Sequence, residues 1–273
     1  MGGRRGKIGA AIVIVVLVAI FLAYRYHHVG ALGGHQSHRI AFSPSEADAR
    51  ISAANARLKD SPEDLDALTQ LAIAYYAKGP ESYVDAMNAL EKARTLGATN
   101  ESLFFYAGVM YDALGLPDYA INEFKKYLRH FPRDYEALVR LGNLYFRDGQ
   151  DSDAARVYQE AIALWPKDPT VLFNNAVVSV HNGDLATAQK MLDQVQALTG
   201  ALPVGGLFVK GEIERVKGST ETAVPLYQQE IAKSPDYLPA LQALEAALRQ
   251  KSDWKDAKAL RIKIEQLKAA AHG

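Results

Sequence analysis

The chain has 273 residues, of which 49% are hydrophobic, and its formal net charge is zero. It contains no cysteine, which excludes disulfides, thiolate metal sites, a cysteine nucleophile and covalent haem attachment. Residues 1–44 carry five basic residues and no acid, so the remainder holds 26 basic against 31 acidic residues. That remainder lacks the surplus of Lys and Arg typical of nucleic-acid-binding surfaces, and we expect no nucleic-acid partner.

The N-terminal part predicts a membrane anchor. Residues 8–24 are 17 residues without a charge, and as a helix they would extend about 26 Å, which nearly spans a bilayer. Arg4, Arg5 and Lys7 precede this run, whereas only Arg25 follows it closely. The positive-inside bias therefore predicts residues 1–24 to be a cytoplasmic stub and a single transmembrane helix. The rest of the chain would lie across the inner membrane, in the periplasm of a bacterium.

A cleaved signal peptide is the alternative interpretation, with Val29 and Ala31 as the small residues of a cleavage site. The apolar run is longer than the roughly 7 to 15 residues typical of a signal-peptide core. In addition, Arg25, His27 and His28 lie between the run and the possible site. A retained anchor is favoured.

Residues 25–44 are interpreted as a flexible polar spacer with a Gly-Gly pair and four of the seven histidines, His27, His28, His35 and His38. Neutral imidazoles are ligands for Zn²⁺ or Cu²⁺, which leaves metal binding by this segment open. No carboxylate or thiol is placed to complete a site, and we expect neither a metal nor a cofactor.

Residues 45–64 are expected to form an N-terminal capping helix. Ser43, Pro44 and Glu46 form a capping-box pattern with Pro at the first helical position, and Pro62 ends the helix.

From residue 65 to 273 the chain has a tandem repeat. Small residues recur in one set at Ala72, Gly108, Gly142, Ala176 and Gly211, and in a second set at Ala86, Ala120, Ala154, Ala188, Ala223 and Ala257. The steps within the second set are 34, 34, 34, 35 and 34 residues. Glycines at 79, 115, 149, 183 and 218 follow the same period, and Pro132, Pro166 and Pro235 end units. The register shifts once, at Pro203.

Each unit reads as two helices of about 12 to 14 residues. A small residue on each helix lets the two backbones approach closely, and a turn glycine can take the left-handed conformation that ends the first helix. Proline ends the second helix. The aromatic residues are expected to pack between helices, namely Tyr75, Tyr111, Phe124, Tyr145, Tyr158 and Tyr227.

This pattern resembles the tetratricopeptide repeat (TPR). The resemblance implies an all-α fold, a right-handed α-solenoid of about six helix-turn-helix units that follow the single transmembrane helix. It covers about three quarters of the chain. Departures occur at Ser179, Glu214, Glu245 and Pro225, the last of which is expected to interrupt a second helix. The final unit is expected to be a C-terminal cap with an apolar stripe of Trp254, Ala257, Leu260, Ile264 and Leu267.

In the resembled family, the first helices line a concave groove that binds a partner peptide. The corresponding positions here are mostly apolar: Phe105, Tyr106, Val109, Val139, Arg140, Asn143, Phe173, Asn174, Val177, Phe208 and Val209. Arg140, Asn143 and Asn174 match part of a clamp for a C-terminal carboxylate, but Val139, Gly205 and Val209 replace its polar members. The resemblance therefore implies a protein or peptide partner, either an amphipathic helix or an extended segment.

The sequence indicates a binding protein and not an enzyme. No Ser-His-Asp triad, paired carboxylates or phosphate-binding glycine loop is present at an informative spacing, and His130 and His181 are isolated. Two functions stay open. One is a membrane-anchored scaffold for assembly of an envelope complex, and the other is a substrate-presenting subunit for cytochrome c maturation or another client-delivery system. The sequence leaves the partner, the pathway and the oligomeric state open.

Overall fold

The computed structural model describes residues 42–272, in which thirteen α-helices and one short 3-10 helix occur and no strand is present. The chain divides into two compact units between Leu144 and Tyr145. The first unit contains α2 (Pro44–Asp60), α3 (Leu65–Lys78), η1 (Pro80–Ser82), α4 (Tyr83–Thr95), α5 (Ser102–Ala113), α6 (Pro117–His130) and most of α7 (Tyr135–Arg147). The second contains α8 (Asp151–Leu164), α9 (Pro169–His181), α10 (Leu185–Thr199), α11 (Gly206–Val216), α12 (Thr220–Lys233), α13 (Leu238–Gln250) and α14 (Trp254–His272).

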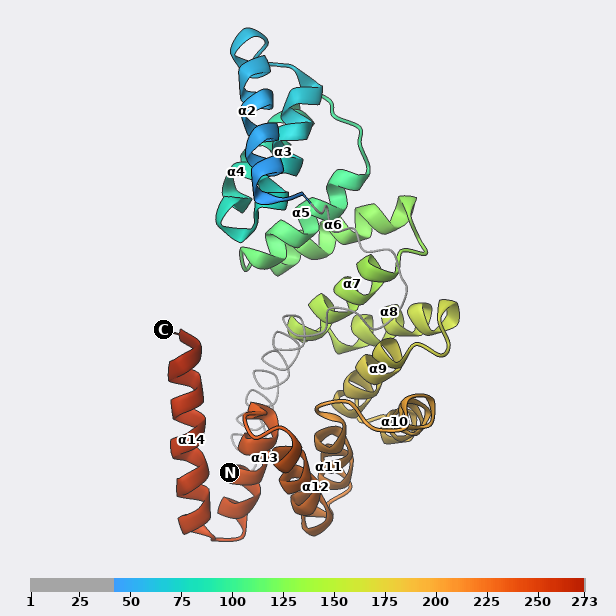
Figure 1. Ribbon diagram of the computed structural model, residues 1–273. Helices are drawn as coiled ribbons and strands as arrows, with labels where there is room; N and C mark the ends of the chain where they lie inside the picture. The colour runs from blue at the N-terminus through green and yellow to red at the C-terminus, as the bar shows by residue number, and fades with distance from the viewer. Residues whose placement is uncertain (1–41, 273) are drawn as a thin grey trace, which may run out of the picture. The chain divides into compact units, whose positions relative to one another are not determined.

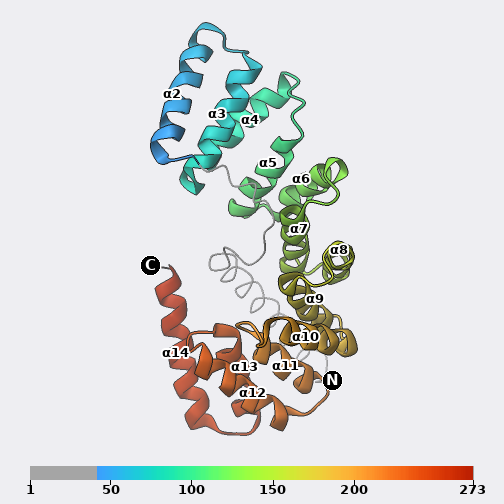
Figure 2. The same ribbon diagram turned by 45° about the vertical axis from the view of Figure 1, so that its right-hand side comes forward.

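The helical repeat is confirmed. Successive helices pack as pairs, and Figures 1 and 2 show them as neighbouring antiparallel rods, for example α5 with α6 and α13 with α14. The predicted membrane helix at residues 8–24, the spacer histidines and the possible cleavage site lie outside the described residues. Between residues 42 and 272, none of the helices combines the length and apolar character needed to cross a membrane.

The capping helix α2 begins as predicted. The Ser43 hydroxyl accepts a hydrogen bond from the Glu46 N–H at 3.3 Å, and the Glu46 carboxylate accepts one from the Ser43 N–H at 2.8 Å. This reciprocal pair satisfies two amides that a helix N-terminus leaves without intrahelical partners.

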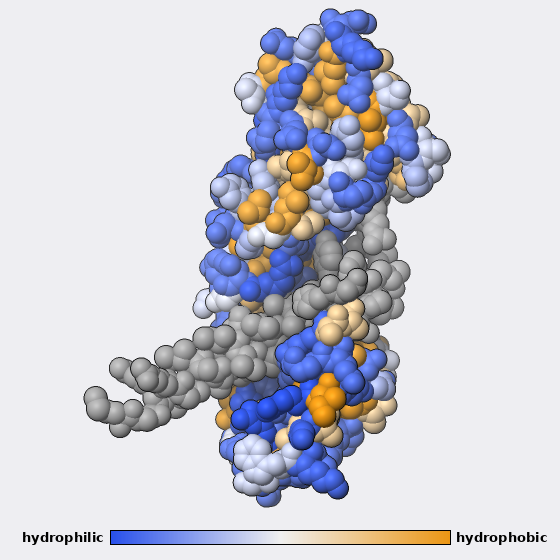
Figure 3. Space-filling model, turned by 90° about the vertical axis from the view of Figure 1, so that its left-hand side faces the viewer, coloured by the Kyte–Doolittle hydropathy of each residue, from blue (hydrophilic) through white to orange (hydrophobic). Residues whose placement is uncertain are grey.

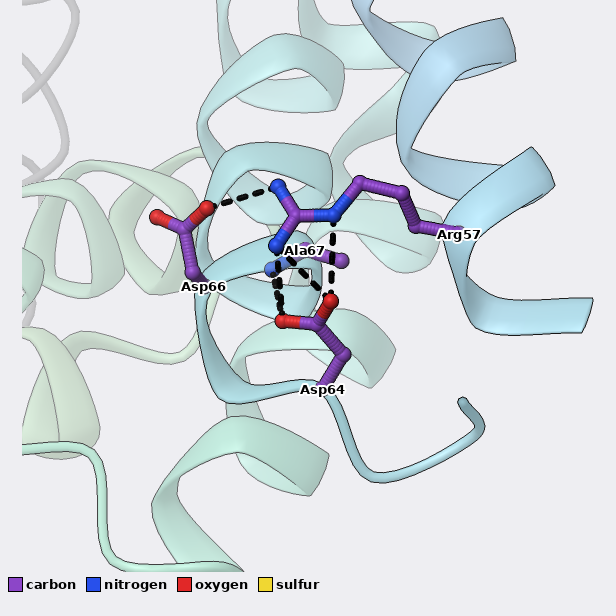
Figure 4. A network of polar contacts seen from close by, with 4 residues as sticks. All are labelled: Arg57, Asp64, Asp66 and Ala67. Atoms are coloured by element: carbon purple, nitrogen blue, oxygen red, sulfur yellow. Dashed lines mark hydrogen bonds and ion pairs between the residues drawn. The ribbon is translucent and has the colours of Figure 1, made fainter. Parts of the chain in front are cut away.

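An ion-pair network joins the C-terminal end of α2 to the start of α3 (Figure 4). The Arg57 guanidinium donates to both oxygens of Asp64, at distances down to 2.7 Å, and to Asp66 at 2.7 Å. Asp64 is also the N-cap of α3 and accepts a hydrogen bond from the Ala67 N–H. That amide, followed by Arg57, lowers the pKa of the Asp64 carboxyl. One carboxylate thus starts α3 and connects it to the capping helix.

The same kind of cap recurs at later first helices. Asp134 accepts from the Ala137 N–H at the start of α7, and Asp168 accepts from the Val171 N–H at the start of α9. An Asp at the N-cap satisfies amides that the helix cannot pair internally, and its charge is favoured by the helix dipole.

The small residues of the repeat are buried where helices meet. All six alanines of the second set have almost no exposed surface. The predicted turn glycines all have positive φ, and Ser252 has positive φ in the last turn. Gly79 differs from the prediction, because its φ of 121° and ψ of −178° lie outside the left-handed helical region. The prediction that Pro225 interrupts a second helix is wrong. Helix α12 is continuous from Thr220 to Lys233, and the proline lies exposed inside it.

Two glycines allow an aromatic ring of the second helix to lie directly on the first helix. A Cβ atom added to Gly211 would be 2.4 Å from Cε1 of Tyr227, and one added to Gly108 would be 2.9 Å from Cε2 of Phe124. Both rings are fully buried. At these positions the repeat requires the absence of a side chain, because a real Cβ does not approach a ring so closely.

We expect Gly211→Ala to lower stability by about 1 to 3 kcal/mol, the usual cost of overpacking a well-packed core. The helix preference of Ala acts in the opposite direction and is smaller, up to about 1 kcal/mol. Thermal unfolding followed by circular dichroism measures the change. Tyr227→Leu in the same chain should recover part of the loss that Gly211→Ala causes, and equal stability of Gly211→Ala and the native protein would contradict the proposed packing.

The shift in register at Pro203 has a structural counterpart in Glu230 of α12. This carboxylate is only 1% exposed, and it accepts hydrogen bonds from the N–H groups of Gly205 at 2.8 Å, Leu207 at 3.0 Å and Phe208 at 3.4 Å. The N-cap of α11 is Gly205, which has no side chain to accept these bonds. Glu230 therefore caps α11 from the neighbouring helix.

Replacement of Glu230 by Gln should destabilise the protein by about 1 to 3 kcal/mol, because the amide removes the negative charge and turns a donor toward backbone N–H groups. Chemical unfolding of Glu230→Gln and of the exposed neighbour Gln229→Glu measures this effect. The neighbour substitution serves as the control and should be nearly neutral. A neutral Glu230→Gln would show that the cap contributes little.

Candidate functional site

The residues predicted to line a groove come from four first helices, but the structure buries most of them. Phe105 and Val109 of α5, Phe173, Asn174 and Val177 of α9, and Phe208 and Val209 of α11 are buried. Tyr106 of α5 and Val139, Arg140 and Asn143 of α7 are half-buried, and the Arg140 side chain is only 15% exposed. Only the latter four residues therefore offer surface to a partner.

The expectation that Phe105, Phe173 and Phe208 present their rings to a groove is corrected. Phe105 is 1% exposed and lies edge-on to Phe124 at 5.6 Å and to Tyr127 at 5.3 Å between ring centroids. Phe173 is 0% exposed. Phe208 packs against Tyr227 and Tyr237 at 6.0 and 5.7 Å. These rings fill the space between helices and contribute hydrophobic burial to the fold.

Five half-buried residues of the first unit lie on α3, α5 and α7, and we call this set the first-helix surface: Tyr76, Tyr106, Val139, Arg140 and Asn143. The Tyr106 ring lies 4.8 Å from that of Tyr76 and 6.0 Å from that of Phe105. Arg140 of α7 lies over the Phe105 ring at 5.8 Å. These contacts connect the three helices, with the buried Phe105 ring between Tyr106 and Arg140.

Tyr76 is the member that sequence reasoning missed. It lies four residues after Ala72, one helical turn along the same face, and directly after Tyr75, the aromatic residue assigned to packing. Two consecutive tyrosines on a helix point about 100° apart, so the second was available as a surface residue.

Arg140 supplies the charge of the first-helix surface. Its Nε and Nη2 donate to Glu136 Oε1, one turn earlier, at 2.9 and 2.7 Å. Burial lowers the pKa of Arg140 to about 10, so the guanidinium is still protonated at neutral pH. A cation that is partly withdrawn from water interacts more strongly with an incoming carboxylate than a fully solvated one does.

The two histidines predicted to be isolated both have neighbours. His181 Nδ1 lies 2.8 Å from Asp151 Oδ2, with its ring edge-on to Phe146 at 5.3 Å. His130 stacks on Phe104 at 6.2 Å. Neither belongs to a larger group, because residues 42–272 contain no cluster of three or more His, Cys, Asp or Glu residues that could hold a metal ion.

Residues 109–169, from α5 through α8 to the start of α9, match the family model described as Tetratricopeptide repeat. This stretch of the chain therefore carries the tetratricopeptide repeat pattern. The match covers the Gly142, Tyr145, Ala154 and Pro166 pattern, and the paired helices on either side continue the same period.

Two curated proteins share part of this sequence. Superkiller complex protein 3 from Homo sapiens is 31% identical over 108 residues, which is 40% of this chain and 7% of that protein. U-box domain-containing protein 70 from Oryza sativa subsp. japonica is 29% identical over 103 residues, 38% of this chain and 13% of that protein. The chain spans only a small part of either relative.

Solved structures share the fold more widely. A tetratricopeptide repeat protein from Parabacteroides merdae ATCC 43184 superposes with a TM-score of 0.63 at 14% identity, over 82% of this chain and 87% of that one. YrrB, described as a TPR protein with an unusual peptide-binding site, has a TM-score of 0.58 at 20% identity, over 71% and 98%. PilW, described as a type IV pilus biogenesis factor, has a TM-score of 0.50 at 20% identity, over 70% and 87%.

Proposed function

We propose that this protein is a membrane-anchored TPR scaffold that binds a protein or peptide partner during assembly of an envelope complex. The observation that supports partner binding most directly is the first-helix surface. There Tyr76, Tyr106 and Arg140, on three successive first helices, keep part of their surface exposed, whereas Phe105, Phe173 and Phe208 are buried. Partly exposed aromatic and Arg residues are the side chains that contribute most to protein interfaces.

The chemistry of this surface fits a partner segment with an apolar face and a carboxylate. The rings of Tyr76 and Tyr106 offer flat apolar area, and Arg140 offers a charged donor that is already oriented by Glu136. Exchange of the Glu136 contact for a partner carboxylate would keep the guanidinium paired throughout binding. A helix or an extended segment with such a pattern would satisfy both features.

We expect Tyr106→Ala with Arg140→Gln to weaken partner binding by at least tenfold, because each truncation at the centre of an interface typically costs about 1 to 3 kcal/mol. Partners are cross-linked in native membranes and identified by mass spectrometry, and the affinity of the purified partner is then measured by titration calorimetry. Arg156→Gln is the matched control, since Arg156 is an exposed arginine of α8 with two intrahelical ion pairs. Unchanged affinity in the double variant would reject the first-helix surface as the binding site.

The proposed location rests on residues 8–24 and on the positive charges before them. We expect the protein to stay in the membrane pellet after alkaline carbonate extraction and residues 45–273 to be digested by protease added to spheroplasts. Val16→Arg with Ala19→Arg should release the protein, because each arginine near the centre of a membrane helix costs about 2.5 to 3.5 kcal/mol. Release of the native protein, or protection of its C-terminal part, would contradict the proposal.

A further inference from the structure

The turn between α5 and α6 is apolar where all later turns of the repeat are polar. Leu114, Leu116 and Tyr119 occupy three positions of this turn. The same positions hold Asp148, Gln150 and Asp153 in the next repeat and Asn182, Asp184 and Thr187 in the one after it. In the last two repeats the same positions hold Lys217, Ser219 and Thr222, and then Lys251, Asp253 and Asp256. Because four other turns form with polar residues, the fold does not require apolar ones here.

Tyr119, in the first turn of α6, packs its ring against that of Tyr111 at 5.2 Å, whereas Leu114 and Leu116 are not buried within the fold. Leu114, Leu116 and Tyr119 are 40%, 41% and 59% exposed. Leu116 is the N-cap of α6, where its side chain makes no capping hydrogen bond, whereas Asp184 at the same position accepts one from the Thr187 N–H. Leucine is among the least favourable N-cap residues. A residue that neither caps nor is buried, and that costs stability locally, indicates a site used for binding.

Acidic residues outnumber basic ones in the sequence up to and including the exposed turn, and Lys125, Lys126 and Arg129 follow it on α6. Residues 79–122 contain six acidic side chains, Glu81, Asp85, Glu91, Glu101, Asp112 and Asp118, against only two basic ones, Lys92 and Arg94. Asp85 and Asp118 are exposed and form no ion pair with any described residue. Figure 3 shows one face of the molecule, on which hydrophobic side chains lie among hydrophilic ones. An apolar patch with an acidic rim is complementary to an apolar patch with a basic rim.

Helix α14, the last of the array, presents such a surface. Trp254 and Ile262 are 61% and 52% exposed, although the end of a repeat array normally has a polar outer face. Lys255 and Lys258 are exposed beside them and have no ion-pair partner within residues 42–272. Residues 254–268 hold five basic side chains and two acidic ones. The α5–α6 turn and the terminal helix α14 therefore both carry exposed apolar side chains, among charges of opposite sign.

We propose that copies of this chain associate head to tail, with α14 of one copy docked on the α5–α6 turn of the next. This contact is heterologous, because the two surfaces differ, so each bound pair keeps one free turn and one free α14. The inference goes beyond the proposed function, and it depends neither on the first-helix surface nor on the membrane anchor. The patches are small, so the association is weak and dependent on concentration and salt.

The test is sedimentation velocity of the full chain in a density-matched detergent, from about 10 µM to about 1 mM, the range in which a weak contact becomes populated. The native protein should form dimers and larger species as the concentration rises. Leu116→Asp alone and Ile262→Asp alone should stay monomeric, because each variant has lost one of the two surfaces. An equimolar mixture of the two variants should form a dimer and nothing larger, since the intact α14 of one variant meets the intact turn of the other.

Folding of the variants is checked by their melting temperatures. Leu116→Asp should melt at the same temperature as the native protein or higher, because Asp is a favoured N-cap residue. Leu198→Asp, at another exposed leucine on α10, is the matched control and should associate as the native protein does. A native protein that is monomeric over the whole range would overturn the proposal. So would a variant mixture that does not dimerise, or a single variant that still associates like the native protein.

Discussion

The close approach of paired helices at residues with little or no side chain is the constraint on which the rest of this structure depends. Gly108 and Gly211 let the rings of Phe124 and Tyr227 lie against the backbone of the first helix, and the six alanines of the second helices are buried. This spacing fixes which face of each helix turns inward. It therefore also fixes which residues are left half-exposed, among them Tyr106 and Arg140.

The same constraint explains how much of the fold the sequence predicts. Small residues at a fixed period can be read directly, and the helix pairs, the turn glycines, the terminal prolines and the Ser43 capping box all follow from local rules. The continuity of α12 through Pro225 did not follow from these local rules. A proline removes one backbone hydrogen bond, and on the solvent face of this helix that loss is tolerated. The capping role of Glu230 could not be predicted from local sequence, because Glu230 and Gly205 are 25 residues apart in the chain.

The candidate site was predicted less well, for a physical reason. Helix α5 carries apolar side chains around most of its circumference, so periodicity does not distinguish a ring that packs inside its own repeat from one that faces outward. Phe105 and Tyr106 are adjacent in sequence, yet the first is core and the second reaches the surface. How far a side chain is buried depends on the neighbouring helices, and the position of a residue in the repeat does not determine it. Arg140 keeps 15% of its side chain exposed and pairs with Glu136, and its role in partner binding stays a prediction.

The cap that Glu230 provides also affects the local unfolding of α11 and α12. Helices α3, α7 and α9 begin at aspartates that lie next to them in the chain, so each carries the signal for its own start. Helix α11 has no such residue and obtains its carboxylate only when α12 is already in place. Fraying of α12 therefore exposes the first amides of α11 to solvent at the same moment. In hydrogen exchange, these two helices would behave as a single opening unit, whereas the aspartate-capped helices can keep their first turn when a neighbour opens.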